Sequence, residues 1–330
     1  MFFIVTRELQ ITEWLNNILK NQEYTIKPAS SDASFRRYFR IVSNNQSYIL
    51  MDAPPEKENS KPFVDIANVL FKAGLNVPKI YEADLKEGFL LLSDLGNKTY
   101  LDELNHQNAS LLYRDAYLAL IKIQKNADTQ SLKLYDDSLL MEELRLFPDW
   151  YLKFHKSYEM NDSEKNALDS TFDLLIQNIK SHTQVFVHRD FHSRNLMFCN
   201  GDLGENPGIL DFQDAVKGSI VYDLVSLFKD AYIVWSEEEM MDWLIRYWEQ
   251  AKQNKLKVQD DFAEFYRDFE WMGVQRHLKV LGIFARLNYR DYKANYLNDL
   301  PAVENYLRRA CERYKDLHPL LKLMNKLSST

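Results

Sequence analysis

The stretch VFVHRDFHSRNLMF, residues 185–198, places a polar loop between two apolar runs. A second short segment, ILDFQ at residues 209–213, follows after the turn-forming Asn-Gly-Asp and Pro-Gly steps. The β-rich runs predict short strands that hold the polar side chains of the loop on one rigid platform. Three of these side chains are Asp190, Asn195 and Asp211, in the order Asp, Asn, Asp.

The order of these side chains suits phosphoryl transfer. That reaction needs a carboxylate to orient the attacking hydroxyl and accept its proton, and metal ions that bridge the phosphates. Asp190 fits the first role, and Asn195 and Asp211 offer oxygen ligands for Mg²⁺. A lone His-x-Asp is explained by an Asp that caps a loop. The whole His-x-Asp-x₄-Asn pattern with its later apolar-Asp-Phe step indicates a kinase. We interpret His188 as structural, while Arg189 either pairs with an acid or touches substrate.

The first 95 residues predict a small antiparallel sheet with an opening helix and one internal helix. Apolar residues recur at helical spacing near the start and again before Gly74, and short extended runs separated by turns surround them. The predicted helices cover residues 11–19 and 63–71, and the predicted strands cover 24–27, 38–42, 48–51, 79–83 and 89–93.

Beyond Leu95-Gly96 the chain consists of long helical patterns, interrupted by strand signals only at residues 185–214. The clearest helical patterns are residues 111–124, 163–180, 237–248 and 303–314. The fold class is therefore α+β: a bilobal, protein-kinase-like fold with a small antiparallel-sheet N-lobe and a larger, mainly helical C-lobe. We expect a nucleotide-binding lobe at 1–95 and a catalytic and substrate-binding lobe at 96–330.

Composition narrows the class of partner. The chain has 330 residues, 46% of them hydrophobic, and a formal net charge of −7. That balance argues against nucleic acid or an anionic membrane as partner, because both reward clustered Lys and Arg. The sequence indicates no obligate protein partner, and its partner is expected to be a small molecule.

Cysteine usage and the N-terminus bear on the compartment. The two cysteines, Cys199 and Cys311, lack the close spacing of zinc or redox sites. The apolar residues 1–5 are followed at once by Thr-Arg-Glu, so this run is too short for a signal or membrane segment. We expect a cytoplasmic protein.

These motifs resemble the aminoglycoside phosphotransferase and choline kinase superfamily, through residues 187–198 and 209–213. Within it, the sequence is most similar to the anomeric N-acetylmuramate/N-acetylglucosamine kinase family of bacterial cell-wall recycling. The supporting stretches are DASFRRYFR at 32–40, MDAPPE at 51–56, LLLSDLG at 90–96, DFQDAV at 211–216 and QRHLKVLG at 275–282.

The resemblance implies ATP and Mg²⁺ as cofactors and transfer of the γ-phosphoryl group to the C1 hydroxyl of an amino sugar. It places adenine near the backbone of Ser93 to Leu95. It also makes the turn with Ser31, Ser34 and Arg36 the phosphate loop. A solvated hairpin turn is the alternative for that segment.

The phosphate side departs from the kinase pattern in two ways. The turn at residues 30–37 contains no Gly, and Met51 stands near the strand position expected for a phosphate-binding Lys. Methionine cannot balance phosphate charge. The cations that could replace the Lys, and a possible ion-pair partner at Asp65, are near in sequence: Arg36, Arg37, Arg40, Lys57 and Lys61.

The sugar site is expected in the helical lobe, with Glu143, Trp150, Arg276 and His277 as candidates beside Asp190. Charged helix residues are more often solvated, and a Trp is more often core, so these alternatives stay open.

Two other functions also stay open. One is a kinase for a different small alcohol, such as an aminoglycoside or choline. The other is a noncatalytic nucleotide-binding regulator, suggested by Met51 and the glycine-free turn.

Overall fold

The computed structural model describes residues 6–31 and 35–327. Contacts within the chain divide it into two compact units. The first contains residues 1–103 and 196–214, and the second contains residues 104–195 and 215–330. Asp211 belongs to the first unit, whereas Asp190 and Asn195 belong to the second. The lobe limits predicted at residues 95 and 96 stay a prediction.

The first unit is built on a five-stranded antiparallel sheet with the strand order β1-β2-β3-β5-β4. This confirms the small antiparallel sheet predicted from the short extended runs separated by turns. Its elements are α1 (Arg7–Ile18), β1 (Thr25–Ser31), β2 (Arg37–Ser43), β3 (Gln46–Asp52), α2 (Lys61–Lys72), β4 (Ile80–Asp84), β5 (Phe89–Ser93), α3 (Tyr100–Glu103), β7 (Leu196–Met197), η2 (Gly201–Leu203) and β8 (Gly208–Ile209).

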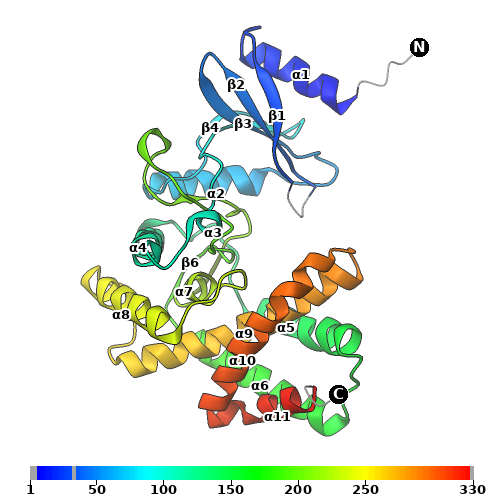
Figure 1. The fold of residues 1–330 in the computed structure, drawn as a ribbon, viewed down its shortest axis with the longest axis vertical. Helices are drawn as coiled ribbons and strands as arrows, with labels where there is room; N and C mark the ends of the chain where they lie inside the picture. The colour runs from blue at the N-terminus through cyan, green and yellow to red at the C-terminus, as the bar shows by residue number, and fades with distance from the viewer. Residues whose placement is uncertain (1–5, 32–34, 328–330) are drawn as a thin grey trace. The chain divides into compact units, whose positions relative to one another are not determined.

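One face of this sheet packs against α1 (Figure 1). Ile11 and Leu15 of the helix join Ile41, Leu50 and Leu91 of the strands in one buried apolar cluster. Side chains two residues apart on a strand share a face, so alternate strand positions supply this cluster. Burial of these apolar groups is the main force that holds α1 on the sheet.

A buried carboxylate also ties α1 to the sheet. The side chain of Asp52, at the end of β3, is fully buried between two guanidinium groups. Arg7 of α1 donates to it at 2.7 Å and Arg37 of β2 at 2.5 Å. Such charge-assisted contacts compensate the desolvation of the carboxylate, and they fix the helix end relative to the strands.

A two-stranded hairpin, β7 with β8, carries the chain toward Asp211. It packs on Leu95 through Met197 and Cys199. Gly208 allows this approach, since an added Cβ would lie 2.8 Å from the Cys199 sulfur.

The second unit is mainly helical, as the sequence predicted, with one two-stranded antiparallel sheet of β6 and β9. Its elements are α4 (Ala109–Asn126), α5 (Asp137–Leu146), η1 (Phe147–His155), α6 (Asp162–Ser181), β6 (Gln184–Val187), β9 (Val216–Ser219), α7 (Tyr222–Phe228), α8 (Glu237–Gln253), α9 (Phe262–Tyr289), η3 (Ala294–Asp299), α10 (Leu300–Arg313), η4 (Lys315–Leu317) and α11 (His318–Leu327).

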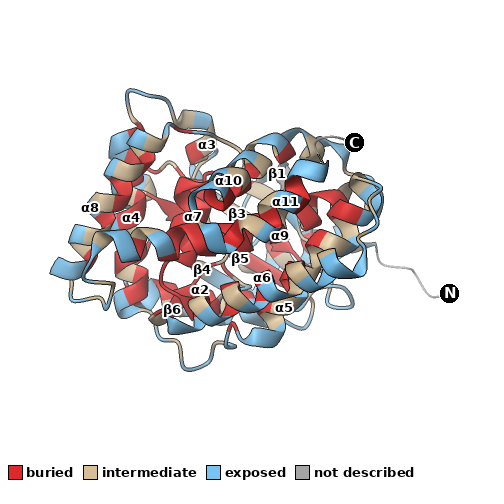
Figure 2. Ribbon diagram, turned by 90° about the horizontal axis from the view of Figure 1, so that it is seen from below, coloured by how far each residue is buried: buried red, intermediate tan, exposed pale blue. Residues whose placement is uncertain are grey.

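Helix α9 is the core of this unit. It runs for 28 residues and contacts α5, η1, α6, α7, η3 and α10. Every residue of α7 is buried as well, which Figure 2 shows as an unbroken red helix. Residues 268–279 of α9 are buried too. A helical segment that is buried on all sides is fixed by its neighbours, so α7 and this part of α9 form a rigid support for the residues that they carry.

The close approach of α9 to the junction of α5 and η1 depends on Gly282. An added Cβ at this position would lie 2.4 Å from the carbonyl carbon and oxygen of Leu146. Immediately after Leu146 the chain continues as η1, a π-helix. The contact is therefore backbone against backbone, and no side-chain rotation relieves it.

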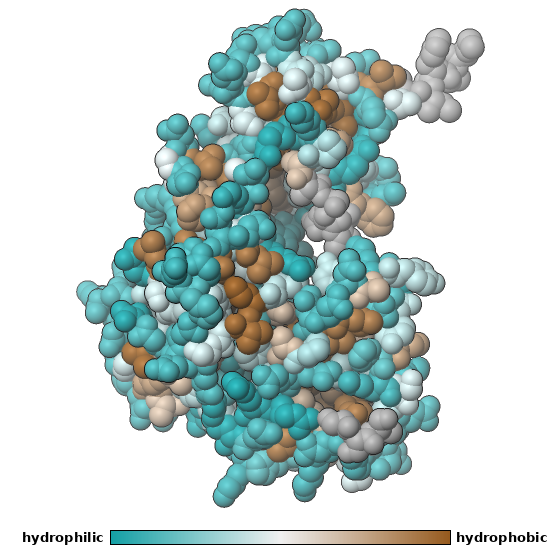
Figure 3. All heavy atoms as spheres, in the orientation of Figure 1, coloured by the Kyte–Doolittle hydropathy of each residue, from teal (hydrophilic) through white to brown (hydrophobic). Residues whose placement is uncertain are grey.

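The described side chains on the face seen in Figure 3 are mostly hydrophilic, and the apolar ones gather in small separate groups. Within residues 6–31 and 35–327, no helix combines the length and the apolar character needed to cross a membrane.

The packing at Gly282 gives a direct test of this unit. Gly282→Ala should lower the free energy of unfolding by about 2 kcal/mol, because the new methyl group overpacks against the Leu146 backbone. Gly273→Ala in the same helix is the matched control, since its Cβ would first meet another atom at 3.6 Å. That control should be neutral or gain up to about 1 kcal/mol from helix propensity. Urea unfolding measures both, and equal effects of the two substitutions would contradict the packing described.

Candidate active site

The loop after β6 carries the predicted catalytic residues and is held by a buried carboxylate. Asp223, in the first turn of α7, accepts hydrogen bonds from the backbone N–H groups of His188 at 2.7 Å and Arg189 at 3.0 Å. Asp223 is 1% exposed, and burial raises its pKa to about 7. The brace is needed because Arg189 has a φ of 77°, a left-handed conformation that costs energy for a residue with a side chain.

His188 is part of the scaffold, as its pattern predicted. Its ring is fully buried, and Nδ1 accepts the backbone N–H of Asp190 at 3.2 Å. The ring also packs edge-on against Phe191, with centroids 5.7 Å apart. These contacts orient the backbone that carries Asp190.

Asp190 is the accessible carboxylate of the loop, with 41% of its side chain exposed. Burial opposes its ionisation, but Lys279 and Arg276 outweigh this effect and lower its pKa to about 2. The nearest guanidinium nitrogen of Arg276 lies 3.9 Å from Asp190 Oδ1. At neutral pH the carboxylate is therefore ionised and is able to accept a proton.

Arg276, predicted to contact substrate, is 7% exposed and bonds to the protein itself. Its Nη1 donates to the backbone oxygen of Arg189 at 2.9 Å and to the Tyr222 hydroxyl at 3.1 Å. In this geometry Arg276 holds the backbone of the loop at Arg189 and places a positive charge beside Asp190.

Glu143, another predicted substrate contact, is 5% exposed and lies in a cluster of buried charges. It pairs with Arg189 and with Lys279, the latter at 2.9 Å, and it accepts a hydrogen bond from Tyr135. Burial opposes its ionisation, but these cations hold its pKa below the ordinary value. Arg189 thus pairs with an acid, one of the two roles predicted for it. Sugar binding by Glu143 stays a prediction.

The remaining two predicted sugar contacts lie in different surroundings. His277 is 2% exposed and stacks on Tyr306, with ring centroids 5.3 Å apart. Burial holds its pKa well below the usual value, so the imidazole is neutral. Trp150 is only partly buried, within η1, and stacks on Phe154 at 5.0 Å. Their roles toward a sugar stay predictions.

Asn195 closes the loop that begins at His188. Its Nδ2 donates to the backbone oxygen of Asp190 at 3.0 Å. Between them, Ser193 donates through both its N–H and its hydroxyl to Asp230, at 3.0 Å and 2.5 Å. Asp230 was not among the residues predicted from the sequence. Lys279 was not predicted either, although its i, i+3 spacing from Arg276 places the two cations on one helix face.

Asp211, in the first unit, sits at a strained point of the backbone. Its φ is 62°, and Gln213 Nε2 donates to its Oδ1 at 2.7 Å. The next residue, Phe212, is fully buried and packs on Phe63 of α2, with centroids 5.0 Å apart. Strained non-glycine residues of this kind concentrate at functional sites.

The predicted nucleotide contacts also lie in the first unit. Ser93 ends β5 and pairs with Lys79, whose backbone N–H donates to its hydroxyl at 2.9 Å. Leu95 is 6% exposed, and its backbone oxygen accepts from the Cys199 sulfur at 3.6 Å. Ser31 ends β1, while Ser34 lies outside the described residues. The nucleotide roles of these residues stay predictions.

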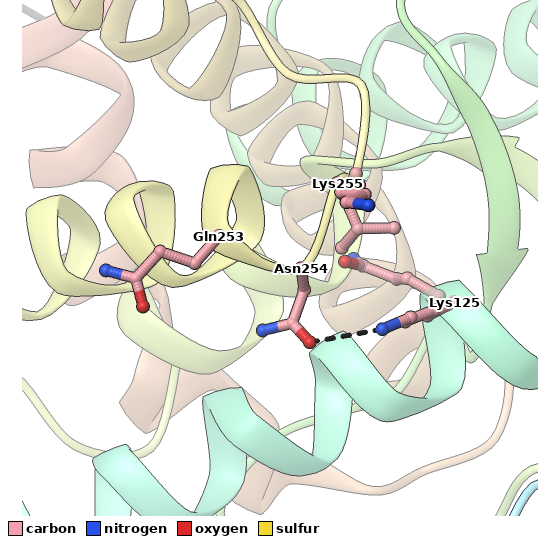
Figure 4. Close-up of a pocket in the computed structure, with 6 residues that line it drawn as sticks. Lys125, Gln253, Asn254 and Lys255 are labelled. Atoms are coloured by element: carbon pink, nitrogen blue, oxygen red, sulfur yellow. Dashed lines mark hydrogen bonds between the residues drawn. The ribbon is translucent and has the colours of Figure 1, made fainter.

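A surface hollow of about 530 Å³ in the second unit lies elsewhere, at the ends of α4 and α8 (Figure 4). Lys125 reaches across it and donates to Asn254 at 3.4 Å. None of the predicted site residues lines this hollow, so it is separate from the predicted phosphoryl-transfer residues.

Comparison with known proteins identifies the family. The model of the phosphotransferase enzyme family matches residues 25–261. The chain belongs to the phosphotransferase enzyme family. This confirms the enzyme class predicted from Asp190, Asn195 and Asp211.

Curated relatives of this phosphotransferase extend over nearly the whole chain. It is 42% identical to the N-acetylmuramate/N-acetylglucosamine kinase of Pseudomonas putida, over 97% of this chain and 96% of that protein. It is 46% identical to the kinase of the same name from Pseudomonas aeruginosa, over 91% and 88% of the two chains. The relative of that name from Neisseria meningitidis is 42% identical, over 97% and 96%. The family resemblance stated from the sequence is thereby confirmed.

Solved structures support the fold of the phosphotransferase. A choline kinase from Streptococcus pneumoniae aligns with a TM-score of 0.65 at 15% identity, covering 91% of this chain and 98% of that one. An ADP-bound aminoglycoside phosphotransferase aligns with a TM-score of 0.58 at 15% identity, covering 90% and 96%. The predicted α+β, kinase-like fold class is confirmed.

The buried cluster at Glu143 provides a test that separates packing from substrate contact. Glu143→Gln should lower the free energy of unfolding by about 3 kcal/mol, because Arg189 and Lys279 then lose their buried anion. Glu142→Gln, at the exposed neighbouring position, is the control and should change stability by less than about 0.5 kcal/mol. Urea unfolding decides. If Glu143→Gln keeps full stability and weakens only sugar binding, the packing role is wrong and the predicted substrate role is right.

Proposed function

We propose that this phosphotransferase transfers the γ-phosphoryl group of ATP to the anomeric C1 hydroxyl of N-acetylmuramate or N-acetylglucosamine. The observation that carries the proposal is the similarity, over nearly the whole chain, to three kinases named for these two amino sugars. The sugar 1-phosphate and ADP would be the products.

Asp190 would orient the C1 hydroxyl and accept its proton as the oxygen attacks the γ-phosphorus. A carboxylate with a pKa of about 2 is a weak base. Phosphoryl transfer has a loose transition state, in which the attacking oxygen gains little charge and needs little help from a base. An anomeric hydroxyl is also more acidic than an ordinary alcohol. Because the anomeric hydroxyl is acidic and the transition state is loose, a base as weak as Asp190 is sufficient.

The charges behind Asp190 favour an uncharged or anionic acceptor. Arg276 lies 3.9 Å from Asp190, and the Lys279 ammonium lies close enough to lower the same pKa. A quaternary ammonium or a polyamine bound at this carboxylate would face these cations. N-Acetylglucosamine is neutral and N-acetylmuramate carries a lactyl carboxylate, so both suit the local charge.

Asn195 and Asp211 would hold Mg²⁺. Both offer hard oxygen ligands, and Mg²⁺ is usually bound by one or two protein groups together with waters and substrate phosphates. The contact of Asn195 Nδ2 with the Asp190 carbonyl fixes the donor end of the amide, so Oδ1 is the ligand atom that this residue would offer. The bound ion would neutralise charge on the phosphate oxygens during transfer.

Adenine would bind the backbone of Ser93 to Leu95. This segment is ordered by Asp94, which accepts from Arg40 at 2.6 Å and from the Gly96 N–H at 2.9 Å. A backbone fixed in this manner presents its N–H and C=O groups in a constant direction, as recognition of a base edge requires.

The proposal is tested by Asp190→Asn. Removing the carboxylate that orients the hydroxyl and accepts its proton should lower kcat by about 10³-fold or more, while ATP binding remains within about twofold. Asp202→Asn is the control, since Asp202 is an exposed aspartate in η2 and should leave kcat unchanged. Coupled assays of ADP release with N-acetylmuramate and N-acetylglucosamine measure the rate, and phosphorus NMR identifies a phosphate at C1.

Choline and kanamycin complete the acceptor panel. ADP release with only these cationic acceptors would overturn the amino-sugar assignment. Full activity of Asp190→Asn on the amino sugars would overturn the role of the base. Tight ATP binding by the unaltered protein without turnover on any acceptor would make it a noncatalytic binder.

A further inference from the structure

Strand β3 contains no cation to meet the phosphates of a nucleotide. Its seven residues are Gln46–Asp52, and Met51 is fully buried between Tyr38 of β2 and Leu90 of β5. Kinases commonly use a strand Lys held by a helix Glu at this point, because the negative phosphates must be oriented and partly neutralised. If the proposed function holds, another cation of the first unit has to supply this charge.

Two arginines of β2 are already neutralised by carboxylates of the sheet. Arg37 holds the fully buried Asp52 with two nitrogens, at 2.8 Å and 2.5 Å. Arg40 holds Asp94 with two nitrogens, at 2.6 Å and 3.0 Å, and also donates to the Gly96 carbonyl. Each of these two arginines stabilises the fold. If it moved away to bind a phosphate, its buried or nearly buried carboxylate partner would lose its compensating charge.

Two lysines nearby are surface groups. Lys61 pairs with Asp65 one helical turn later, and their side chains are 65% and 52% exposed. Lys57 lies over the ring of Phe35 at 4.9 Å, and that Phe is 61% exposed. Exposed flexible cations of this kind are weakly oriented and screened by solvent.

Arg36 differs from all four. Its side chain is only 9% exposed, and Nη2 lies 3.2 Å from Glu58 Oε2, a longer contact than those of Arg37 with Asp52 and of Arg40 with Asp94. The other oxygen of Glu58 accepts the backbone N–H of Phe35 at 3.3 Å. One carboxylate therefore holds both the guanidinium of Arg36 and the backbone of the residue before it.

The same part of the first unit contains the proposed metal ligand. Glu58 lies three residues before α2, and Phe63 in the first turn of α2 packs on Phe212, the residue after Asp211. The Arg36 and Glu58 pair and Asp211 are thus both connected to the start of one helix. A cation and a metal ligand placed on the same support are what a polyphosphate chain requires.

We propose that Arg36, held by Glu58, binds the phosphates of the nucleotide and replaces the Lys that β3 lacks. The guanidinium fork matches phosphate oxygens in geometry, and its charge persists at every physiological pH. Glu58 acts as a positioning residue, because it orients the fork and balances its charge when no nucleotide is bound. The proposal rests on the proposed function insofar as the nucleotide is ATP.

The test compares nucleotides that differ only in their phosphates. In calorimetric titrations of the full chain, Arg36→Ala should weaken ATP binding by about 10- to 100-fold and leave adenosine binding within about twofold. Arg36→Lys should recover part of the loss, because it retains the charge without the fork. Lys61→Ala removes an exposed cation from the same region and should leave both affinities unchanged.

Glu58→Gln supplies the second variant. It should weaken ATP binding less than Arg36→Ala does, and the double variant should bind ATP as Arg36→Ala does, since both changes act through one contact. Additive losses in the double variant would overturn the positioning role.

If Arg36 only stabilised the fold, its removal would affect the binding of ATP and of adenosine alike. Equal losses of ATP and adenosine affinity in Arg36→Ala, or an unchanged ATP affinity, would overturn the proposal. A failure of the proposed function gives a different result, in which the unaltered protein binds ATP but does not phosphorylate an amino sugar. In that case the comparison of ATP with adenosine still decides whether Arg36 binds the phosphates.

Discussion

The loop that carries Asp190 depends on one contact, the carboxylate of Asp223. It accepts the backbone N–H groups of His188 and Arg189 from within α7, a helix whose residues are all buried. Because α7 cannot shift without disturbing its packing, the two backbone groups are fixed in space. They in turn hold Arg189 in a left-handed conformation and determine where Asp190, the next residue, points. The direction of the Asp190 carboxylate is thus set by core packing.

Beneath this loop Glu143 pairs with Arg189 and Lys279, and Arg276 lies beside Asp190. These cations lower the pKa of Asp190. The arrangement costs desolvation energy, which the network of hydrogen bonds offsets. One consequence is that the Asp190 carboxylate remains ionised. Under the proposed function, the same cations would disfavour a positively charged acceptor, so one cluster of side chains would serve both stability and substrate preference.

Local patterns in the sequence predicted the elements well. Helical spacing of apolar residues predicted α1, α2, α4, α6, α8 and α10, and short extended runs between turns predicted the five strands of the sheet. The 28-residue helix α9 was not among the helices predicted. The spacing of Asp190 and Asn195 predicted the phosphotransferase class. The contacts of Glu143 and Arg276 could not be predicted from local sequence patterns. Glu143 meets Lys279 across 136 positions of chain, a pairing set by the packing of α5 on α9, which no local pattern encodes. The partly buried pair of Arg36 and Glu58 was missed for the same reason.

The central claim is that Asp223 holds the loop that carries Asp190. Hydrogen exchange at the backbone amides of His188 and Arg189, in the unaltered protein and in Asp223→Asn, tests it most directly. An asparagine has one acceptor oxygen in place of two, so at least one amide should exchange about tenfold faster or more in the variant. The amides of α9 should keep their protection. Equal exchange at both loop amides in the two proteins would contradict the claim.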